Sequence, residues 1–273
     1  MSLLVGCDPE VFLAKNGVPF SAYGIIPGDK RNPHPVRCGA VQVDGMAAEF
    51  NITPSQNASL FSHRIQTVLG GLEKRIREHG LEFYIKPSAT FPRDHYDEQP
   101  DDAKELGCDP DYNAYTGEVN PRPDPGDRPF RTAAGHVHLG WTEGAETDSI
   151  NHMQDCREMI AQLDWYLGLP SLLFDDDHDR RTLYGAAGAF RPKPYGCEYR
   201  VLSNAWLRHP ELMKWVFNNT KLAFNQLKKG NAIVNKWGAA GDFINNSRNF
   251  QREHILVLLE DTGVPLPPNV ELQ

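Results

Sequence analysis

The chain has few cysteines, and none are spaced for a disulfide framework or a zinc knuckle. The five cysteines lie far apart and include no C-x-x-C pair, so they are predicted to be reduced thiols. No window approaches about 18 uninterrupted apolar residues, and the N-terminal MSLLVGCDPE lacks a basic segment followed by an apolar run. We therefore expect no membrane span, no signal peptide and a cytoplasmic location.

Positive charge is also scarce. The chain has 28 Lys and Arg against 36 Asp and Glu, for a net charge of -8. This balance argues against binding of duplex nucleic acid through phosphate contacts, which requires a clustered basic surface. Any anionic ligand must be held by a local group of arginines. A nucleotide would also have to bind without a P-loop, because no G-x-x-x-x-G-K-[ST] element is present.

The predicted strands have one polar face and one apolar face. In RTAAGHVHLGW, His136 and His138 share one face and Val137 and Leu139 the other, since side chains alternate along a strand. Taken alone, such a histidine pair is as consistent with hydrogen bonding inside a sheet as with chemistry.

Two further strand segments repeat this design. In GAVQVDGMAAEFNI, an Asp44-Gly45 turn predicts a hairpin with Gln42 opposite Ala47, and Glu49 lies on the polar face. In CEYRVL, Glu198 and Arg200 share a face. A structural ion pair is an alternative reading of these last two residues.

The spacing of apolar residues along the rest of the chain predicts a single α+β domain over residues 1–273. Its antiparallel strands would have helices packed on one face. The first strand is interrupted at Asp8-Pro9, because proline removes a ladder donor. Helices are predicted near 55–79, 148–174, 210–228 and 241–261, with a break or kink at Pro170, and another strand at 81–91. The loop from 92 to 130 is rich in Pro, Asp, Gly and Asn, and we expect it to be a lid.

Carboxylates and imidazoles from separate strands form the candidate site. Oxygen and nitrogen donors without cysteine suit Mg²⁺ or Mn²⁺. Arginines beside such a site indicate phosphate chemistry, because metals and guanidinium groups together neutralise a phosphoryl group in transfer. The predicted donors are Asp8, Glu10, Glu49, His136, His138 and Glu198, and the arginines of the same segment are Arg180, Arg181, Arg191 and Arg200.

The chain resembles the phage-associated carboxylate-amine ligases (COOH·NH2 ligase type 2, or amidoligases). These belong to the wider superfamily of glutamine synthetase and glutamate-cysteine ligase. The resemblance rests on an ordered set of segments: GCDPEVFL, IPGDK, VQVDGMAAEFNI, GCDPDYNAYTGEVN, RTAAGHVHLGW and YGAAGAFRPKPYGCEYRVLSNAW. It implies a curved antiparallel sheet with helices behind it, and a location in the host cell if a phage encodes the protein.

The resemblance also implies roles for individual residues. Two metal ions are implied, one near the acceptor held by Glu10 and Glu49, and one bridging the ATP phosphates held by Asp8, His136 and Glu198. The phosphates would be contacted by Arg191 and Arg200, and the carboxylate substrate or departing phosphate by Arg181. His138 would support or orient the substrate. Lys30, in IPGDK, is either a contact to an anionic substrate or a solvated loop lysine.

The implied reaction joins a carboxylate to an amine through an acyl phosphate made from ATP. The substrates would be small molecules or peptides. An oligomeric protein is compatible with the resemblance. Three rival hypotheses remain at this point. They are a guanidino-kinase type phosphotransferase, a metal-dependent hydrolase that uses His136, His138 and Glu198 without nucleotide, and a catalytically silent relative acting as a structural or binding protein.

Overall fold

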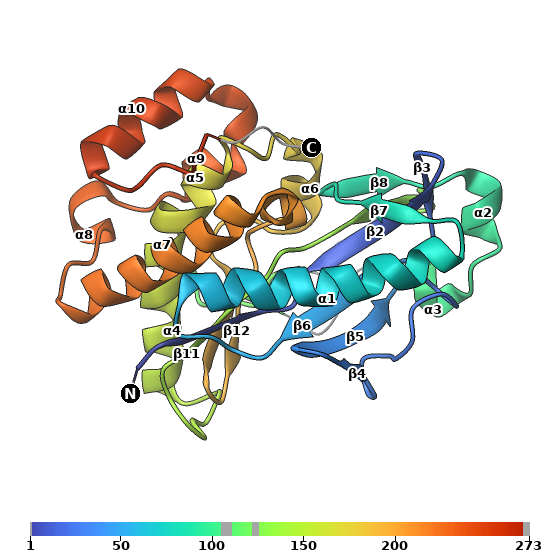
Figure 1. The fold of residues 1–273 in the computed structure, drawn as a ribbon. Helices are drawn as coiled ribbons and strands as arrows, with labels where there is room; N and C mark the ends of the chain where they lie inside the picture. The colour runs from blue at the N-terminus through green and yellow to red at the C-terminus, as the bar shows by residue number, and fades with distance from the viewer. Residues whose placement is uncertain (1, 105–110, 122–125, 270–273) are drawn as a thin grey trace.

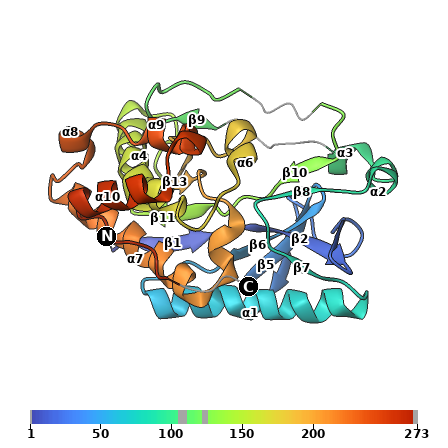
Figure 2. The same ribbon diagram turned by 90° about the horizontal axis from the view of Figure 1, so that it is seen from above.

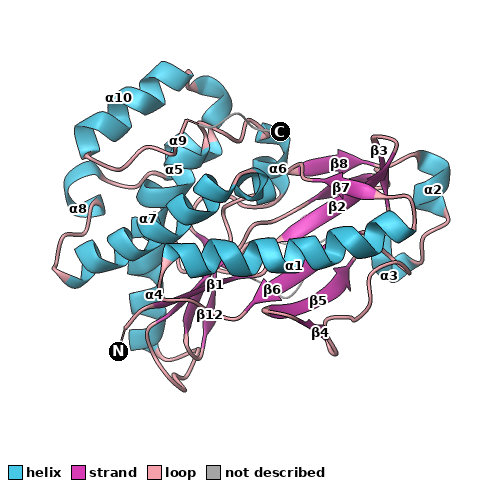
Figure 3. Cartoon of the chain, viewed as in Figure 1, coloured by secondary structure: helices cyan, strands magenta, loops and turns pink. Residues whose placement is uncertain are grey.

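A computed structural model describes residues 2–104, 111–121 and 126–269 (Figure 1). It shows the predicted α+β fold, with antiparallel strands and helices packed against them (Figure 3). Within the described residues, no helix is both long and apolar enough to cross a membrane. The assignment of residues 1–273 to a single domain stays a prediction.

Most strands belong to two sheets. The first sheet has the order β1-β11-β13-β12-β9. Its strands are β1 Leu4–Cys7, β11 Val137–Gly140, β13 Gly196–Tyr199, β12 Ala189–Lys193 and β9 Tyr112–Asn113. The second has the order β3-β2-β6-β5-β4, with β7 paired to β2. Its strands are β3 Val18–Phe20, β2 Glu10–Lys15, β6 Ala47–Ile52, β5 Gly39–Asp44, β4 His34–Val36 and β7 Glu82–Tyr84.

The chain passes from the first sheet to the second at Asp8-Pro9. The predicted interruption is confirmed, because β1 ends at Cys7 and β2 begins at Glu10. Pro9 has no N–H to donate, and its carbonyl accepts from the Phe50 amide instead. The residues around this break therefore lie where the two sheets meet.

The turn of the β5–β6 hairpin lies one residue later than predicted, so the strand pairing differs from the predicted register by two residues. Gln42 lies opposite Glu49, not Ala47, because the two-residue turn is Gly45-Met46. Gly45 has a φ of 57°, and a turn with glycine at its first central position needs positive φ only there. An Asp44-Gly45 turn of the predicted kind would need positive φ at Asp44 as well. The slip leaves the two faces of the hairpin unchanged.

Helices cover the apolar faces of these sheets. α1 Ala58–Glu78 begins at Asn57, whose side chain accepts from the Leu60 amide. It packs on β5, β6 and β7, and α4 Ile150–Leu163 packs on β12 and β13. α7 Pro210–Lys228 joins them by packing on both α1 and α4 (Figure 1). Figure 2 shows α2, α3 and β9 on the side of the strands away from α1.

Several predicted segments are divided more finely than expected. Residues 81–91 form β7 and β8 Ser88–Thr90, and β8 pairs with β10 Phe130–Thr132 in a separate small sheet. The region 148–174 continues from α4 through a π-helical turn, Asp164–Gly168, to α5 Leu169–Ser171, so the helix ends directly after Pro170. The region 241–261 is split into α9 Gly241–Asn245, a 3-10 turn Ser247–Asn249 and α10 Arg252–Thr262.

The remaining helices are short. The predicted loop 92–130 contains α2 Arg93–Asp97, α3 Asp101–Lys104 and β9, while residues 105–110 and 122–125 of this predicted lid lie outside the described residues. Later in the chain come α6 His178–Leu183, the 3-10 helix Asn204–Arg208 and α8 Val234–Trp237.

Candidate functional site

A row of side chains crosses the first sheet on one face. Gly6, His138, Glu198 and Arg191 are consecutive partners on β1, β11, β13 and β12. Directly opposed residues in antiparallel strands share a face. The next row is apolar and consists of Cys7, Val137, Tyr199 and Phe190. The alternation predicted for the histidine and glutamate strands is therefore present in the fold.

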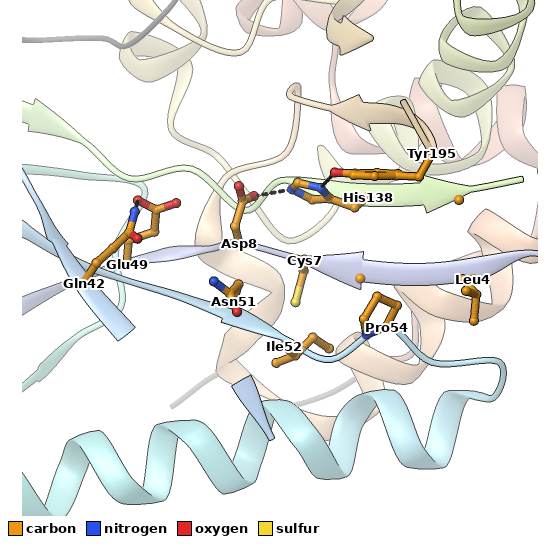
Figure 4. A pocket seen from close by; sticks show the side chains of 12 residues that line it. Leu4, Cys7, Asp8, Gln42, Glu49, Asn51, Ile52, Pro54, His138 and Tyr195 are labelled. Carbon is orange, nitrogen blue, oxygen red and sulfur yellow. Dashed lines mark hydrogen bonds and ion pairs between the residues drawn. The ribbon is translucent and has the colours of Figure 1, made fainter. Parts of the chain in front are cut away.

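Asp8 follows β1 directly, two residues after Gly6, and faces both histidines. Its Oδ1 atom is 2.8 Å from His138 Nε2 and 3.4 Å from His136 Nδ1. The other ring nitrogen of His138, Nδ1, hydrogen-bonds the hydroxyl of Tyr195, in the turn between β12 and β13. In Figure 4, Asp8 and His138 lie on the side of β1 away from α1, whereas Cys7 points toward α1.

Glu198 is fully buried and surrounded by cations. Its Oε2 atom lies 2.8 Å from Lys193 Nζ and 3.5 Å from Arg191 NH1, and its Oε1 atom pairs with Arg200. The same Oε1 atom is 3.3 Å from His136 Nδ1. An isolated carboxylate at this depth would be costly, and these partners compensate its charge.

Arg200 connects this cluster to the predicted lid segment. Its Nε atom lies 3.1 Å from Asp111 Oδ2, and Asp111 directly precedes β9. The guanidinium group also lies 5.3 Å from the centre of the Tyr184 ring. The described part of the segment 92–130 is thus attached to the floor of the site.

Glu10 and Glu49 form the part of the site contributed by the second sheet. They are direct partners across β2 and β6. Glu10 accepts from the Ala134 amide at 2.9 Å, and Glu49 accepts from the Gln42 side chain at 2.6 Å. Burial and the charge of Asp44 raise the pKa of Glu10 to about 7. Burial and the charges of Asp8 and Asp44 raise the pKa of Glu49 well above its ordinary value.

The pKa values of Asp8 and His136 are lowered, whereas the pKa of His138 is raised. Burial favours the neutral acid, but the two histidines outweigh it and lower the pKa of Asp8. Burial also favours the neutral ring of His138, but the Asp8 charge outweighs it and raises the pKa of His138. Burial and the Arg200 charge lower the pKa of His136. Near neutral pH, His136 is therefore a neutral ring with a nitrogen available as a ligand.

A cavity of about 470 Å³ opens beside Asp8 and His138, between the first and second sheets (Figure 4). Residues of β1, β5, β6 and β11 line it, together with the turn residue Tyr195. The full lining is Leu4, Gly6, Cys7, Asp8, Gln42, Glu49, Asn51, Ile52, Pro54, His138, Gly140 and Tyr195. Because Gly6 has no side chain, the space next to His138 in the row stays open.

The donor atoms fit a divalent cation. One ligand atom from each of Asp8, His138 and Glu198 lies within 4.8 Å of the others. This set contains His138 where the resemblance implied His136. His136 Nε2 is buried and makes no hydrogen bond among the described residues, so it is a further nitrogen donor beside the same carboxylates. Carboxylate and imidazole donors of this kind suit Mg²⁺ or Mn²⁺.

Most of the predicted site residues thus come together, but two have other partners. Arg181 is buried, with its NH2 atom 3.0 Å from Asp175 Oδ2 and donating to the Asp175 carbonyl. Lys30 is half exposed and pairs with Asp44 at 2.8 Å. Asp44 is the last residue of β5 in the second sheet. Asp44 is itself close enough to influence the pKa values of Glu10 and Glu49.

Sequence reasoning missed Lys193, Tyr195 and Asp111. Lys193 could have been found, because it is two residues after Arg191 on the same strand and therefore on the same face. Tyr195 lies in a turn, and Asp111 lies far along the chain in an irregular segment. No periodicity reports on where such side chains lie.

The comparisons with known proteins agree with the resemblance. Residues 127–255 match the family model of the phage phiEco32-like COOH.NH2 ligases, type 2. The matched region contains the histidine strand, β12, β13 and Arg200, and the match agrees with the resemblance seen in the sequence motifs.

The chain is also similar to solved structures. The chain is similar to a "novel glutamine synthase homolog", with 13% identity, a TM-score of 0.44, and coverage of 84% of this chain and 56% of that one. It is similar to "Apo GmaS without ligand", with 13% identity, a TM-score of 0.40, and coverage of 82% and 55%. The chain thus spans little more than half the length of these structures. No curated protein sequence matches it at a significant level.

Proposed function

We propose that the protein is an ATP-dependent ligase that joins a carboxylate to an amine, with Mg²⁺ or Mn²⁺ as cofactor. The observation that carries this proposal is the meeting of two kinds of groups beside one cavity. Metal-type donors, Asp8, His138 and Glu198, adjoin three cations, Arg191, Lys193 and Arg200. This pairing suits the phosphates of a nucleotide, and the family match to residues 127–255 supports it.

The residues divide into those that would hold metal and those that would hold phosphate. Asp8, His138 and Glu198 would hold one cation, with His136 as a further donor, and Glu10 and Glu49 would hold another near the acceptor. A bound divalent cation supplies positive charge against the phosphate oxygens. Arg191, Lys193 and Arg200 would contact the same oxygens and stabilise the charge that develops on the transferred group.

The proposed reaction has two steps. In the first, a carboxylate oxygen of the substrate attacks the γ-phosphorus of ATP, the bond from that phosphorus to the bridging oxygen breaks, and ADP leaves. In the second, the amine nitrogen attacks the acyl carbon, and the bond to the phosphate oxygen breaks. Inorganic phosphate departs, and the proton lost by the nitrogen passes to a carboxylate, for which Glu49 is placed on the cavity wall.

Release of ADP tests this proposal. Purified protein, Mg²⁺ and ATP are incubated with pooled carboxylic acids and pooled amines, together and separately. One acid pool carries ¹⁸O in the carboxylate. We expect ADP only when both pools are present, with one ¹⁸O atom transferred to inorganic phosphate. Glu198→Gln should abolish this turnover, and circular dichroism should show that the variant is folded.

The rival hypotheses give different results. Phosphate transfer to an amine without movement of ¹⁸O would indicate a guanidino-kinase type reaction. Turnover without nucleotide would indicate a hydrolase. No binding of ATP at millimolar concentration, measured by calorimetry, would overturn the ligase proposal in favour of a silent relative.

A further inference from the structure

A short hairpin of residues 111–121 lies against the cations of the site. It begins at β9, which pairs with β12 at the end of the first sheet. The chain turns at 114–116 and returns, so that the Asn120 amide donates to the carbonyl of Asp111 at 2.8 Å. The hairpin thereby brings the Asp111 carboxylate to the guanidinium group of Arg200.

Both oxygens of Asp111 accept hydrogen bonds. Oδ2 accepts from Arg200 Nε at 3.1 Å, and Oδ1 accepts from the Asn120 side chain at 2.9 Å. Glu198 pairs with a different nitrogen of the same guanidinium group, NH1. A planar group held at two of its nitrogens cannot rotate about its own axis. Asp111 and Glu198 together therefore fix the direction in which Arg200 presents its N–H donors.

One buried carboxylate joins the hairpin to the strand that leads to Arg200. Asp164 is fully buried and accepts from the hydroxyls of Tyr115 and Tyr199, each at 2.7 Å. Tyr115 lies four residues after Asp111, and Tyr199 directly precedes Arg200. Asp164 thus fixes both members of the Asp111–Arg200 pair relative to each other.

α4 supplies a second support for the hairpin. Arg157, on α4, donates to the carbonyls of Ala114 and Tyr115 at 2.8 and 3.2 Å. Asp164 itself begins the π-helical turn that follows α4, and such turns occur frequently at functional sites. The hairpin is therefore held by the helix behind the first sheet as well as by β12.

We propose that Asp111 is a positioning residue, which holds Arg200 in the direction needed to contact the phosphates of ATP, and that Asp164 sets the position of Asp111. This inference rests on the ligase proposal above, in which Arg200 contacts phosphate oxygens. As a charge alone, Asp111 would oppose the binding of a phosphate. As a positioning group, it aligns a cation before charge develops on the transferred group.

Asp111→Asn separates orientation from charge. The amide has one oxygen, so it can accept from Arg200 or from Asn120 but not from both. Calorimetry should show affinity for ATP with Mg²⁺ that is unchanged or up to about tenfold tighter, because an anion has been removed. The rate of ADP release should fall at least about tenfold, because Arg200 is no longer aligned. Weaker ATP binding with unchanged turnover, or no change in either, would overturn the inference.

An exchange of the two side chains is the matched control. In the double variant Asp111→Asn with Asn120→Asp, the amide oxygen at 111 can accept from Arg200 while its NH2 group donates to the carboxylate at 120. We expect turnover to return to within about threefold of the wild type, since the hydrogen bonds are restored. Asn120→Asp alone places two carboxylates together and should lower turnover. No recovery in the double variant would contradict positioning through these hydrogen bonds.

A double-mutant cycle tests the link to Asp164. Tyr115→Phe removes one of the hydroxyls that donate to Asp164 and should lower turnover about threefold to tenfold. In the Asp111→Asn background, the same change should have less than about a twofold further effect, because Tyr115 acts through Asp111. Independent, multiplicative effects of the two changes would refute the role of Asp164.

A reading of Arg200 that needs no turnover separates this inference from the ligase proposal. In whole protein labelled with ¹⁵N-arginine, the Nε–H signal of Arg200 is assigned by its loss in Arg200→Lys. We expect slow exchange of this proton with water in the wild type, and exchange at least about tenfold faster in Asp111→Asn. Fast exchange in the wild type would overturn the inference.

The two proposals can therefore fail separately. The expected exchange rates in a protein that releases no ADP with any pool would retain the orientation of Arg200 by Asp111 and refute the ligase. Ligase turnover that is unaffected by Asp111→Asn would retain the ligase and refute the positioning role.

Discussion

Two groups of arginines lie close together in the sequence and have different partners in the fold. The anchoring cluster is Arg180 and Arg181 of α6 with Asp175. The convergent cluster is Glu198 with Arg191, Lys193 and Arg200. Arg180 donates to the carbonyls of Val201 and Leu202. The anchoring cluster therefore uses its donors to hold the chain, whereas the convergent cluster directs three cations to one carboxylate.

The difference shows which arginines can exchange partners. A backbone carbonyl is fixed by the fold, so an arginine bonded to it has no alternative geometry. A carboxylate next to a cavity can share its cations with a bound anion. The two clusters are neighbours, because the Tyr184 ring lies 5.9 Å from the Arg180 guanidinium and 5.3 Å from that of Arg200. Proximity to the site alone does not distinguish them.

The largest expected effect is on folding, in the anchoring cluster. Arg181→Met removes the partner of buried Asp175, whose side chain is 2% exposed. The free energy of unfolding should fall by about 3–5 kcal/mol, because the buried charge loses its salt-bridge partner and keeps hydrogen bonds from the Ser203 hydroxyl and the Asp177 amide. Urea unfolding measures this change.

The matched control is Arg248→Met, which breaks an exposed pair with Asp179 and should cost less than about 1 kcal/mol. If Arg181→Met instead left stability unchanged and abolished turnover, the contrast between the clusters would fail. The role of Arg181 as a substrate contact, implied by the resemblance, would then be supported.

The next largest effect is on metal binding. Asp8→Asn removes a carboxylate that stays charged at neutral pH, because the histidines lower the pKa of Asp8. The affinity for Mn²⁺ should fall about a hundredfold, since even the loss of a supporting partner of a metal ligand costs tenfold or more. Electron paramagnetic resonance measures free Mn²⁺ directly. Asp155→Asn, a change at an exposed carboxylate on α4, should have no effect, and equal affinities of both variants would place the metal elsewhere.

Much of the fold followed from periodicity in the sequence. The apolar spacing that predicts a helix over 55–79 corresponds to α1, with Phe61, Ile65, Val68, Leu72 and Ile76 buried. The break at Asp8-Pro9 followed from the chemistry of proline. The turn between β5 and β6 was missed by one residue and the strand pairing by two, because Asp44-Gly45 and Gly45-Met46 turns both place glycine in the turn. The division of 81–91 between two sheets depends on partners distant in sequence, which local pattern does not report.

The candidate site was predicted to a similar degree. Strand alternation placed His136 and His138 on one face of their strand, and Glu198 and Arg200 on one face of theirs, because a period of two fixes the face of every side chain. The same logic could not tell that Asp8 contacts His138 more closely than His136, since both lie on that face. Nor could it separate Arg181 from Arg200. Their roles depend on which acceptors surround each guanidinium group, and that is decided by tertiary packing.

A smaller effect is expected from one cation of the convergent cluster. Lys193 is 25% exposed and lies 2.8 Å from Glu198, which keeps Arg200 as a partner when the lysine is removed. Lys193→Met should weaken ATP binding about tenfold, the loss of one charged phosphate contact, and change stability by less than about 1 kcal/mol. Calorimetry with ATP and Mg²⁺ measures the first and urea unfolding the second. Lys214→Met, at an exposed pair with Glu211, should leave both unchanged. Unaltered ATP affinity in Lys193→Met would exclude this cluster as the phosphate site.

The smallest effect is expected at Tyr195, which acts through His138. Its hydroxyl hydrogen-bonds His138 Nδ1. When Nδ1 carries the ring proton and donates it to the Tyr195 oxygen, Nε2, which faces Asp8, keeps its lone pair for the metal. Tyr195→Phe removes one hydrogen bond and should lower kcat/KM about threefold to tenfold. A merely structural tyrosine would not change the histidine, whereas here the ¹⁵N resonances of His138 should shift toward a mixture of tautomers. Tyr23→Phe, at an exposed tyrosine, should change neither. Unchanged ¹⁵N resonances in Tyr195→Phe would mean that Asp8 alone orients the ring, and that the first sheet supplies all the order this histidine needs.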